Sequence, residues 1–147
     1  MNPHVAIIRP NVCALTALGL IIGAIVAGTA AISLSFIIAV IAAFLICGTG
    51  NVINDYFDRE IDKTNAPHRP IPAGLITLAS ALKYFCILTA IGMILAFFVG
   101  IAYLAIAAFN WIIALIYPWK AKKIPIVKNI FVAYLASSSF LAAGLIL

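Results

Sequence analysis

Long apolar stretches dominate this 147-residue sequence and restrict the folds open to it. Hydrophobic residues make up 66% of the chain and charged residues only 9%, which is not the composition of an ordinary soluble domain. A helix needs about 20 apolar residues to cross the ~30 Å hydrocarbon core of a bilayer. We therefore predict a single all-α membrane domain over residues 1–147. Its five transmembrane helices are expected at residues 11–30, 34–54, 78–98, 100–118 and 126–147.

The charged residues predict how these helices are oriented. With five alternating spans, all nine Lys and Arg and all four Asp and Glu fall on one side of the membrane. The net charge is +5, and an excess of Lys and Arg marks cytoplasmic loops. We predict a multi-pass protein of the cell membrane whose charged loops face the cytoplasm. The same orientation explains the positive charge without any nucleic-acid partner.

All four carboxylates lie in one short segment, Asn54-Asp55-Tyr56-Phe57-Asp58-Arg59-Glu60-Ile61-Asp62. On a helix, Asn54, Asp58 and Asp62 are spaced i, i+4 and i+8 and therefore share one face. Charges at a membrane boundary are costly and usually mark function. Oxygen ligands of this kind suit a hard cation, so we predict Mg²⁺ shared with a phosphate-bearing substrate. The competing interpretation is a solvated loop with a helix cap.

The segment after this cluster is predicted to be an ordered, extended turn. It contains three prolines and a glycine within residues 67–74, which prevent a regular helix. Lys63 and Arg69 lie close in sequence to the carboxylates. Because acidic groups bind Mg²⁺ while basic groups bind the remaining phosphate oxygens, we predict a metal–diphosphate site. Its predicted diphosphate contacts are Asp55, Lys63 and Arg69.

The polar residues elsewhere leave alternatives open. Tyr117, Lys122 and Lys123 are explained either as a cytoplasmic anchor beside an aromatic belt or as groups that close over a diphosphate. Asn110 lies in mid-span and either bonds to a neighbouring helix or faces a cavity. The other possible cavity residues are Arg9, Asn11 and Asn51.

Together these motifs resemble the first aspartate-rich motif of the UbiA superfamily of intramembrane prenyltransferases. The resemblance rests on the NxxxDxxxD triad and on the Arg69-Pro70-Ile71-Pro72-Ala73-Gly74 loop, with looser matches at Arg9-Pro10 and Tyr117-Pro118. It implies a bundle of about nine helices around a cavity open to lipid, in which two aspartate-rich motifs hold Mg²⁺ and an isoprenyl diphosphate. It also implies that Asn54, Asp58 and Asp62 bind metal, that Asp58 and Asp62 are catalytic, and that Arg69 with Lys122 or Lys123 contacts the diphosphate.

The sequence departs from the family pattern in one respect. No Asp or Glu follows Asp62, so the second aspartate-rich motif is absent. We expect this chain to correspond to the first five helices of a nine-helix protein, with the remainder supplied by further sequence or by a second polypeptide. We also expect this chain to be inactive alone.

Within the superfamily, these motifs are most similar to those of the archaeal-type enzymes of ether-lipid synthesis. The resemblance implies Mg²⁺-dependent transfer of a geranylgeranyl group from its diphosphate to geranylgeranylglyceryl phosphate, a lipid-like acceptor. Chlorophyllide and aromatic quinone precursors remain alternative acceptors, because the enzymes that act on them have closely similar motifs. Outside this class, a non-catalytic half-bundle that assembles with a partner also remains open. A transporter fits poorly, because every charge lies at one membrane boundary, and the DGxxAR motif of CDP-alcohol phosphotransferases is missing.

Overall fold

Regular helix accounts for most of the chain in this computed structural model. The structure describes residues 2–28, 33–119 and 125–146, without the side chains of Trp119, Pro125 and Lys128. Within those ranges all regular secondary structure is helical, so the predicted all-α class is confirmed. The six helices are α1 (Pro3–Ile7), α2 (Pro10–Val26), α3 (Leu34–Asn65), α4 (Leu78–Val99), α5 (Ile101–Trp119) and α6 (Pro125–Ala143).

Three of the five predicted spans form helices long and apolar enough to cross a membrane, namely Leu34–Asn65, Leu78–Val99 and Ile101–Pro118. The first and last predicted spans contain shorter apolar helices, Pro10–Val26 and Asn129–Ala143. The short helix α1 was not predicted from the sequence. At 1.5 Å per residue, α3 is about 48 Å long and exceeds the ~30 Å bilayer core. Its polar end therefore extends beyond the apolar stretch and carries the acidic cluster on a continuous helix.

Local sequence explains where the helices begin and end. The Ser33 side chain accepts a hydrogen bond from the Phe36 backbone N–H at 3.1 Å, which caps the start of α3. Thr77 caps α4 in the same way through the N–H of Ser80. Gly100, at φ 150°, separates α4 from α5 in a conformation that other residues rarely adopt.

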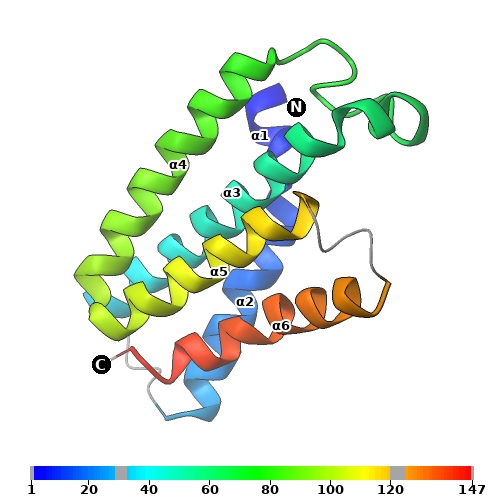
Figure 1. The fold of residues 1–147 in the computed structure, drawn as a ribbon. Coiled ribbons are helices and arrows are strands. Elements are labelled where there is room, and N and C mark those ends of the chain that lie inside the picture. The colour runs from blue at the N-terminus through cyan, green and yellow to red at the C-terminus, as the bar shows by residue number, and fades with distance from the viewer. Residues whose placement is uncertain (1, 29–32, 120–124, 147) are drawn as a thin grey trace.

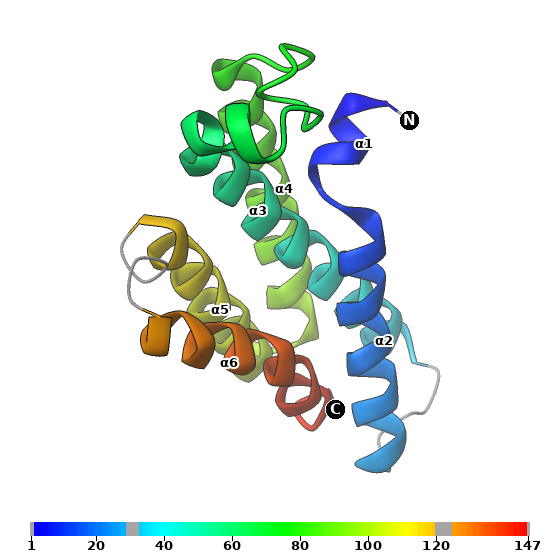
Figure 2. The same ribbon diagram turned by 90° about the vertical axis from the view of Figure 1, so that its right-hand side faces the viewer.

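Helix α3 is central to the arrangement and packs against α1, α2, α4 and α5 (Figure 1). Helix α6 packs against both α2 and α5, so that α2, α3, α5 and α6 form a closed ring. Helix α4 lies outside this ring, against α3 and α5. In both views α1, the end of α3 and the start of α4 gather at the top (Figure 2). The structure thus brings the acidic cluster, the loop after it and the start of the chain to one end of the bundle.

Small residues allow the helices to approach one another closely. An added Cβ on Gly23 of α2 would lie 2.9 Å from Ala143 Cβ and 3.0 Å from Phe140 Cα of α6. Gly92 of α4 approaches Ile46 of α3 in the same way, with 2.8 Å between an added Cβ and Ile46 Cδ1. Such contacts are typical of helix pairs in lipid, where van der Waals packing replaces the hydrophobic driving force.

Candidate functional site

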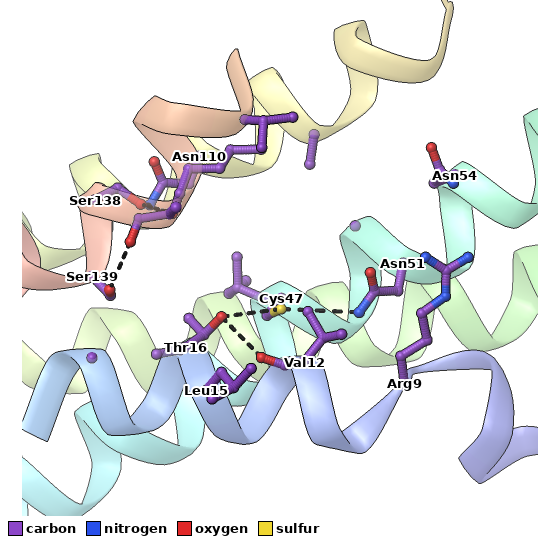
Figure 3. Close-up of a pocket in the computed structure, with 18 of the residues that line it drawn as sticks. Arg9, Val12, Leu15, Thr16, Cys47, Asn51, Asn54, Asn110, Ser138 and Ser139 are labelled. Atoms are coloured by element: carbon purple, nitrogen blue, oxygen red, sulfur yellow. Dashed lines mark hydrogen bonds between the residues drawn. The ribbon is translucent and has the colours of Figure 1, made fainter. Parts of the chain in front are cut away.

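A cavity of about 1030 Å³ lies inside the ring of α2, α3, α5 and α6. Its lining is mostly apolar, and its α3 wall carries Asn54, Asp58 and Asp62. These are the three residues that the sequence spacing predicted to share a helix face. The Asp58 and Asp62 residues are buried, with relative exposures of 6% and 4%. Figure 3 shows Asn54 at one end of this cavity, away from the group formed by Asn110, Ser138 and Ser139.

Hydrogen bonds fix the orientation of the acidic row, the name used here for Asn54, Asp58 and Asp62. The Asn54 amide Nδ2 donates to Asp58 Oδ2 at 3.0 Å, one turn along the helix. Arg69 Nη1 donates to Asp62 Oδ2 at 2.6 Å and forms an ion pair with it. Charge-assisted hydrogen bonds of this length are stronger than neutral ones. Each candidate metal ligand is therefore held in place by a contact with a neighbouring side chain.

The loop after α3 turns Arg69 back toward the helix. The Arg69 N–H donates to the Ala66 carbonyl at 3.0 Å, and the Leu75 N–H donates to the Pro70 carbonyl at 2.9 Å. Gly74 has a φ of 70°, the left-handed conformation that favours glycine. The proline-rich segment thus forms a series of turns, and Arg69 lines the cavity from it.

Asp55 lies behind the cavity wall rather than in it. Its side chain is 2% exposed and does not line the cavity. Arg9 Nη2 contacts Asp55 Oδ1 as a hydrogen bond and ion pair, and Arg69 Nη1 lies 3.5 Å from the same oxygen. A buried carboxylate needs such partners because desolvation of a charge is costly. The predicted diphosphate residue Asp55 is placed here as the counterion of two arginines.

Lys63 points away from the cavity. Its Nζ donates to Glu60 Oε2 at 2.7 Å on the exposed side of α3, beyond the apolar stretch. The hydrogen bond from Lys63 and the charge of Lys63 lower the pKa of the Glu60 carboxyl. Asn11, another predicted cavity residue, is exposed and does not line the cavity.

The remaining predicted residues divide into two groups. Arg9, Asn51, Asn110 and Tyr117 all line the cavity. Asn51 Nδ2 donates to the Ile8 carbonyl at 2.8 Å, which ties α3 to the segment before α2. Lys122 and Lys123 lie outside the described residues.

The structure also places polar residues in the cavity that the sequence interpretation did not select. Ser138 accepts a hydrogen bond from Asn110 Nδ2 at 3.1 Å and joins α6 to α5 (Figure 3). Thr16 of α2 donates to Cys47 Sγ of α3 at 3.4 Å on the opposite wall. The run Ser137-Ser138-Ser139 within an apolar helix was a usable signal, because adjacent polar residues in lipid need partners.

The residues of the acidic row fit a hard cation in kind but provide only part of a coordination sphere. Two carboxylates and one amide oxygen are ligands that Mg²⁺ accepts. No group of three His, Cys, Asp or Glu side chains suited to a metal occurs in the part of the chain that the structure describes. Since Mg²⁺ prefers six oxygen ligands, the remaining ligands have to come from substrate phosphate, water or another segment.

Comparison with known proteins decides the family. The model of the UbiA prenyltransferase family matches residues 15–147, which is most of the chain. The chain belongs to the UbiA prenyltransferase family. Its similar proteins include the digeranylgeranylglyceryl phosphate synthase of Methanopyrus kandleri, 38% identical over 141 residues, and that of Thermococcus kodakarensis, 40% identical over 136 residues. These alignments cover 96% and 92% of this chain but 52% and 49% of the relatives.

Two solved structures share this fold. One, from work on the biosynthesis of digeranylgeranylglyceryl phosphate synthase in membranes, is 37% identical and has a TM-score of 0.92. The aligned region covers 97% of this chain and 51% of the solved chain. The other, a UbiA homolog from Archaeoglobus fulgidus bound to DMAPP and Mg²⁺, has a TM-score of 0.87 at 21% identity, over 97% of this chain and 54% of that one. The chain thus spans about half the length of the relatives it matches.

Proposed function

We propose that this chain takes part in Mg²⁺-dependent transfer of a geranylgeranyl group from its diphosphate to geranylgeranylglyceryl phosphate. The observation that carries this proposal is the row Asn54, Asp58 and Asp62 facing an apolar cavity, with Arg69 beside it. Relatives of the same family at 38% and 40% identity are digeranylgeranylglyceryl phosphate synthases, which supports the choice of donor and acceptor. The product would be an ether lipid of the membrane.

The diphosphate end of the donor would bind at the acidic row. Asn54, Asp58 and Asp62 would ligate Mg²⁺, which when bound neutralises the charge that develops on the leaving pyrophosphate. Arg69 would bind phosphate oxygens that the metal leaves free, because a guanidinium presents paired N–H donors. Tyr117 lines the cavity from α5 and would add a further contact. Lys122 and Lys123, which lie outside the described residues, stay predicted diphosphate contacts. These assignments extend the sequence predictions for the same residues.

The apolar cavity would receive the prenyl chain and exclude water. Its volume of about 1030 Å³ lies just above the ~300–1,000 Å³ that ligand pockets usually have. When the C–O bond to diphosphate breaks, pyrophosphate leaves with the bonding electrons. The allylic cation that remains is reactive toward water, so a dry chamber favours the intended acceptor. The acceptor hydroxyl would form the new C–O bond and lose its proton to the released pyrophosphate.

The chain would provide part of this active site. We propose that its apolar helices form five spans and correspond to part of a nine-helix bundle, with the charged loops in the cytoplasm. A second aspartate-rich segment would supply the missing metal ligands. The half-length match to relatives and the incomplete oxygen sphere both support this arrangement. A non-catalytic half-bundle that assembles with a partner is the alternative that the same half-length match favours.

A transfer assay tests the proposal. Membranes would contain this chain alone, or this chain with the C-terminal half of the Methanopyrus kandleri relative, together with labelled geranylgeranyl diphosphate, Mg²⁺ and competing acceptors. We expect label on geranylgeranylglyceryl phosphate only when both halves are present. Turnover by this chain alone would contradict the shared site. Exclusive labelling of an aromatic acid or of chlorophyllide would overturn the acceptor, and a stable complex without turnover would favour the non-catalytic alternative.

A further inference from the structure

Two arginines from different segments meet on one carboxylate oxygen beside the cavity. Arg9 Nη2 contacts Asp55 Oδ1, and Arg69 Nη1 lies 3.5 Å from the same atom. Both arginines line the cavity, and their side chains are 30% and 29% exposed. Asp55 does not line the cavity and is 2% exposed. A ligand in the cavity would therefore meet the two cations and not their shared anion.

The position of Arg9 is fixed by the backbone as well as by this ion pair. Its φ of 52° and ψ of 70° are left-handed, and it is the one non-glycine residue with positive φ among the described residues. It directly precedes Pro10, the first residue of α2, and Asn51 holds the neighbouring Ile8 carbonyl. Strained backbone of this kind persists where the surroundings impose it, and it clusters at ligand-binding sites. In Figure 3 the Arg9 side chain extends from α2 toward α3 beside Asn51.

The charges beside the cavity favour a second anion. Once Asp58 and Asp62 serve the metal and the donor diphosphate, Asp55 is the carboxylate partner left to Arg9 and Arg69 among the residues that the structure describes. Arg69 also reaches Asp62, so it belongs to the donor side of the site. Among the contacts that the structure describes, Arg9 uses a single nitrogen, Nη2, on a carboxylate. A guanidinium carries five N–H donors, which suit the oxygens of a phosphate group.

We propose that Arg9 binds the phosphate monoester of the lipid acceptor, oriented by Asp55 as a positioning residue. This inference rests on the proposed function. Arg9 meets α3 at Asp55. Asp55 precedes Asp58 by three residues and Asp62 by seven, so Arg9 contacts α3 about one and two helical turns further into the bundle than these two metal-site residues. Glyceryl phosphate carries its hydroxyl and its phosphate a few bonds apart. A phosphate held at Arg9 would thus bring the hydroxyl toward the donor carbon, as a reaction distance of about 3–3.5 Å requires.

The consequence is a basis for acceptor choice. An acceptor without phosphate would leave the cavity-facing N–H donors of Arg9 without an anion in the cavity, whereas a phosphorylated acceptor gains charge-assisted hydrogen bonds. Sites built around a buried polar group discriminate strongly against analogues that lack its partner. Arg9 would then select phosphorylated lipids, and Arg69 would serve the donor diphosphate.

Binding to the two-half bundle of the transfer assay, in nanodiscs of neutral lipid, tests this inference. The probes are an alkylglyceryl phosphate, the matching alkylglycerol, inorganic phosphate, and geranylgeranyl diphosphate with Mg²⁺. The variants are Arg9→Gln and Arg9→Lys, and the matched control is Lys83→Gln, which removes an exposed charge on α4. We expect the wild type to bind the alkylglyceryl phosphate at least about tenfold more tightly than the alkylglycerol, the usual gain from charge-assisted contacts.

In Arg9→Gln we expect this preference to disappear while Mg²⁺-dependent binding of geranylgeranyl diphosphate is retained. If Arg9→Gln does not fold, Arg9→Lys carries the test. We expect it to keep the ion pair with Asp55 but to lose several-fold of the preference, because an ammonium group lacks the planar fork of donors. An unchanged preference in either folded variant overturns the inference, as does a wild type that binds inorganic phosphate but not the lipid phosphate. Failure of the wild type to bind geranylgeranyl diphosphate with Mg²⁺ would instead contradict the proposed function.

Discussion

The Arg69 guanidinium lies 2.6 Å from the Asp62 carboxylate and joins the proline-rich loop to the last turns of α3. The two residues are seven positions apart, and the chain reverses direction between them. A side chain held beside a candidate metal ligand is already positioned for the phosphate oxygens that accompany the metal. The ion pair thereby holds the loop arginine at the donor site that we propose.

Replacing the acidic row should remove metal-dependent turnover. We expect Asp58→Asn and Asp62→Asn each to lower Mg²⁺-dependent release of pyrophosphate by roughly 100-fold or more, because the developing charge loses its stabilisation. The measurement is pyrophosphate release from geranylgeranyl diphosphate by the two-half bundle used in the transfer assay. EDTA should abolish the release and added Mg²⁺ should restore it.

Glu60→Gln is the matched control for this pair of variants. Glu60 lies on the same helix and carries the same charge, but it is exposed and pairs with Lys63 away from the cavity. We expect its release rate to match the wild type. Wild-type release by Asp58→Asn would contradict a metal role for that carboxylate.

Asp55 should matter for stability. The Asp55→Asn variant leaves Arg9 without its carboxylate partner and leaves Arg69 with Asp62 alone, in a place where neither arginine can move fully into water. We expect the free energy of unfolding to fall by about 1–3 kcal/mol, less than for a fully buried pair because the arginines are partly exposed. Thermal unfolding in detergent measures this effect. A variant as stable as Glu60→Gln would show that the arginines do not depend on Asp55.

Helical periodicity explains how much of this arrangement the sequence could predict. Because Asn54, Asp58 and Asp62 repeat every four residues, their common face followed from the spacing alone. The same reasoning could have separated Asp55, since one residue on a helix is a rotation of about 100° and points to another face. The ion pair of Lys63 with Glu60 is likewise a local i, i+3 contact that sequence spacing predicts.

Contacts between distant segments had no comparable signal in the sequence. Arg9 and Asp55 are 46 residues apart, and their pairing depends on the short helix α1 and on the left-handed turn before Pro10. Asn110 needed a partner in any helical arrangement, but its choice of Ser138 depends on how α5 crosses α6. Periodicity predicts helix faces, whereas the identity of the facing helix is set by tertiary packing.

The glycines of α2 should differ in their tolerance of a methyl group. We expect Gly23→Ala to lower the free energy of unfolding by about 1–3 kcal/mol, because its Cβ would meet the Phe140 backbone, which cannot rotate away. Gly19→Ala should cost less, since its nearest neighbour is the Ser139 Oγ at 2.7 Å, the end of a side chain. Thermal unfolding in detergent compares them, with exposed Ala14→Leu as the control for added bulk on α2. Equal losses at both glycines would contradict this account of the α2–α6 contact.

The Asn110–Ser138 pair should show the asymmetry expected of a buried hydrogen bond. Asn110 Nδ2 donates to Ser138 Oγ, while Asn110 Oδ1 is buried and has no hydrogen-bond partner among the described residues. Ser138→Ala would leave the Asn110 amide without its remaining partner, and we expect a loss of about 1–2 kcal/mol in the free energy of unfolding. Asn110→Leu removes the whole amide, and Ser138 still donates to the Leu135 carbonyl at 2.9 Å, so this variant should be near neutral. Thermal unfolding of both variants in detergent measures the two losses. A larger loss of unfolding free energy in Asn110→Leu than in Ser138→Ala would show that the amide contributes more than this single bond.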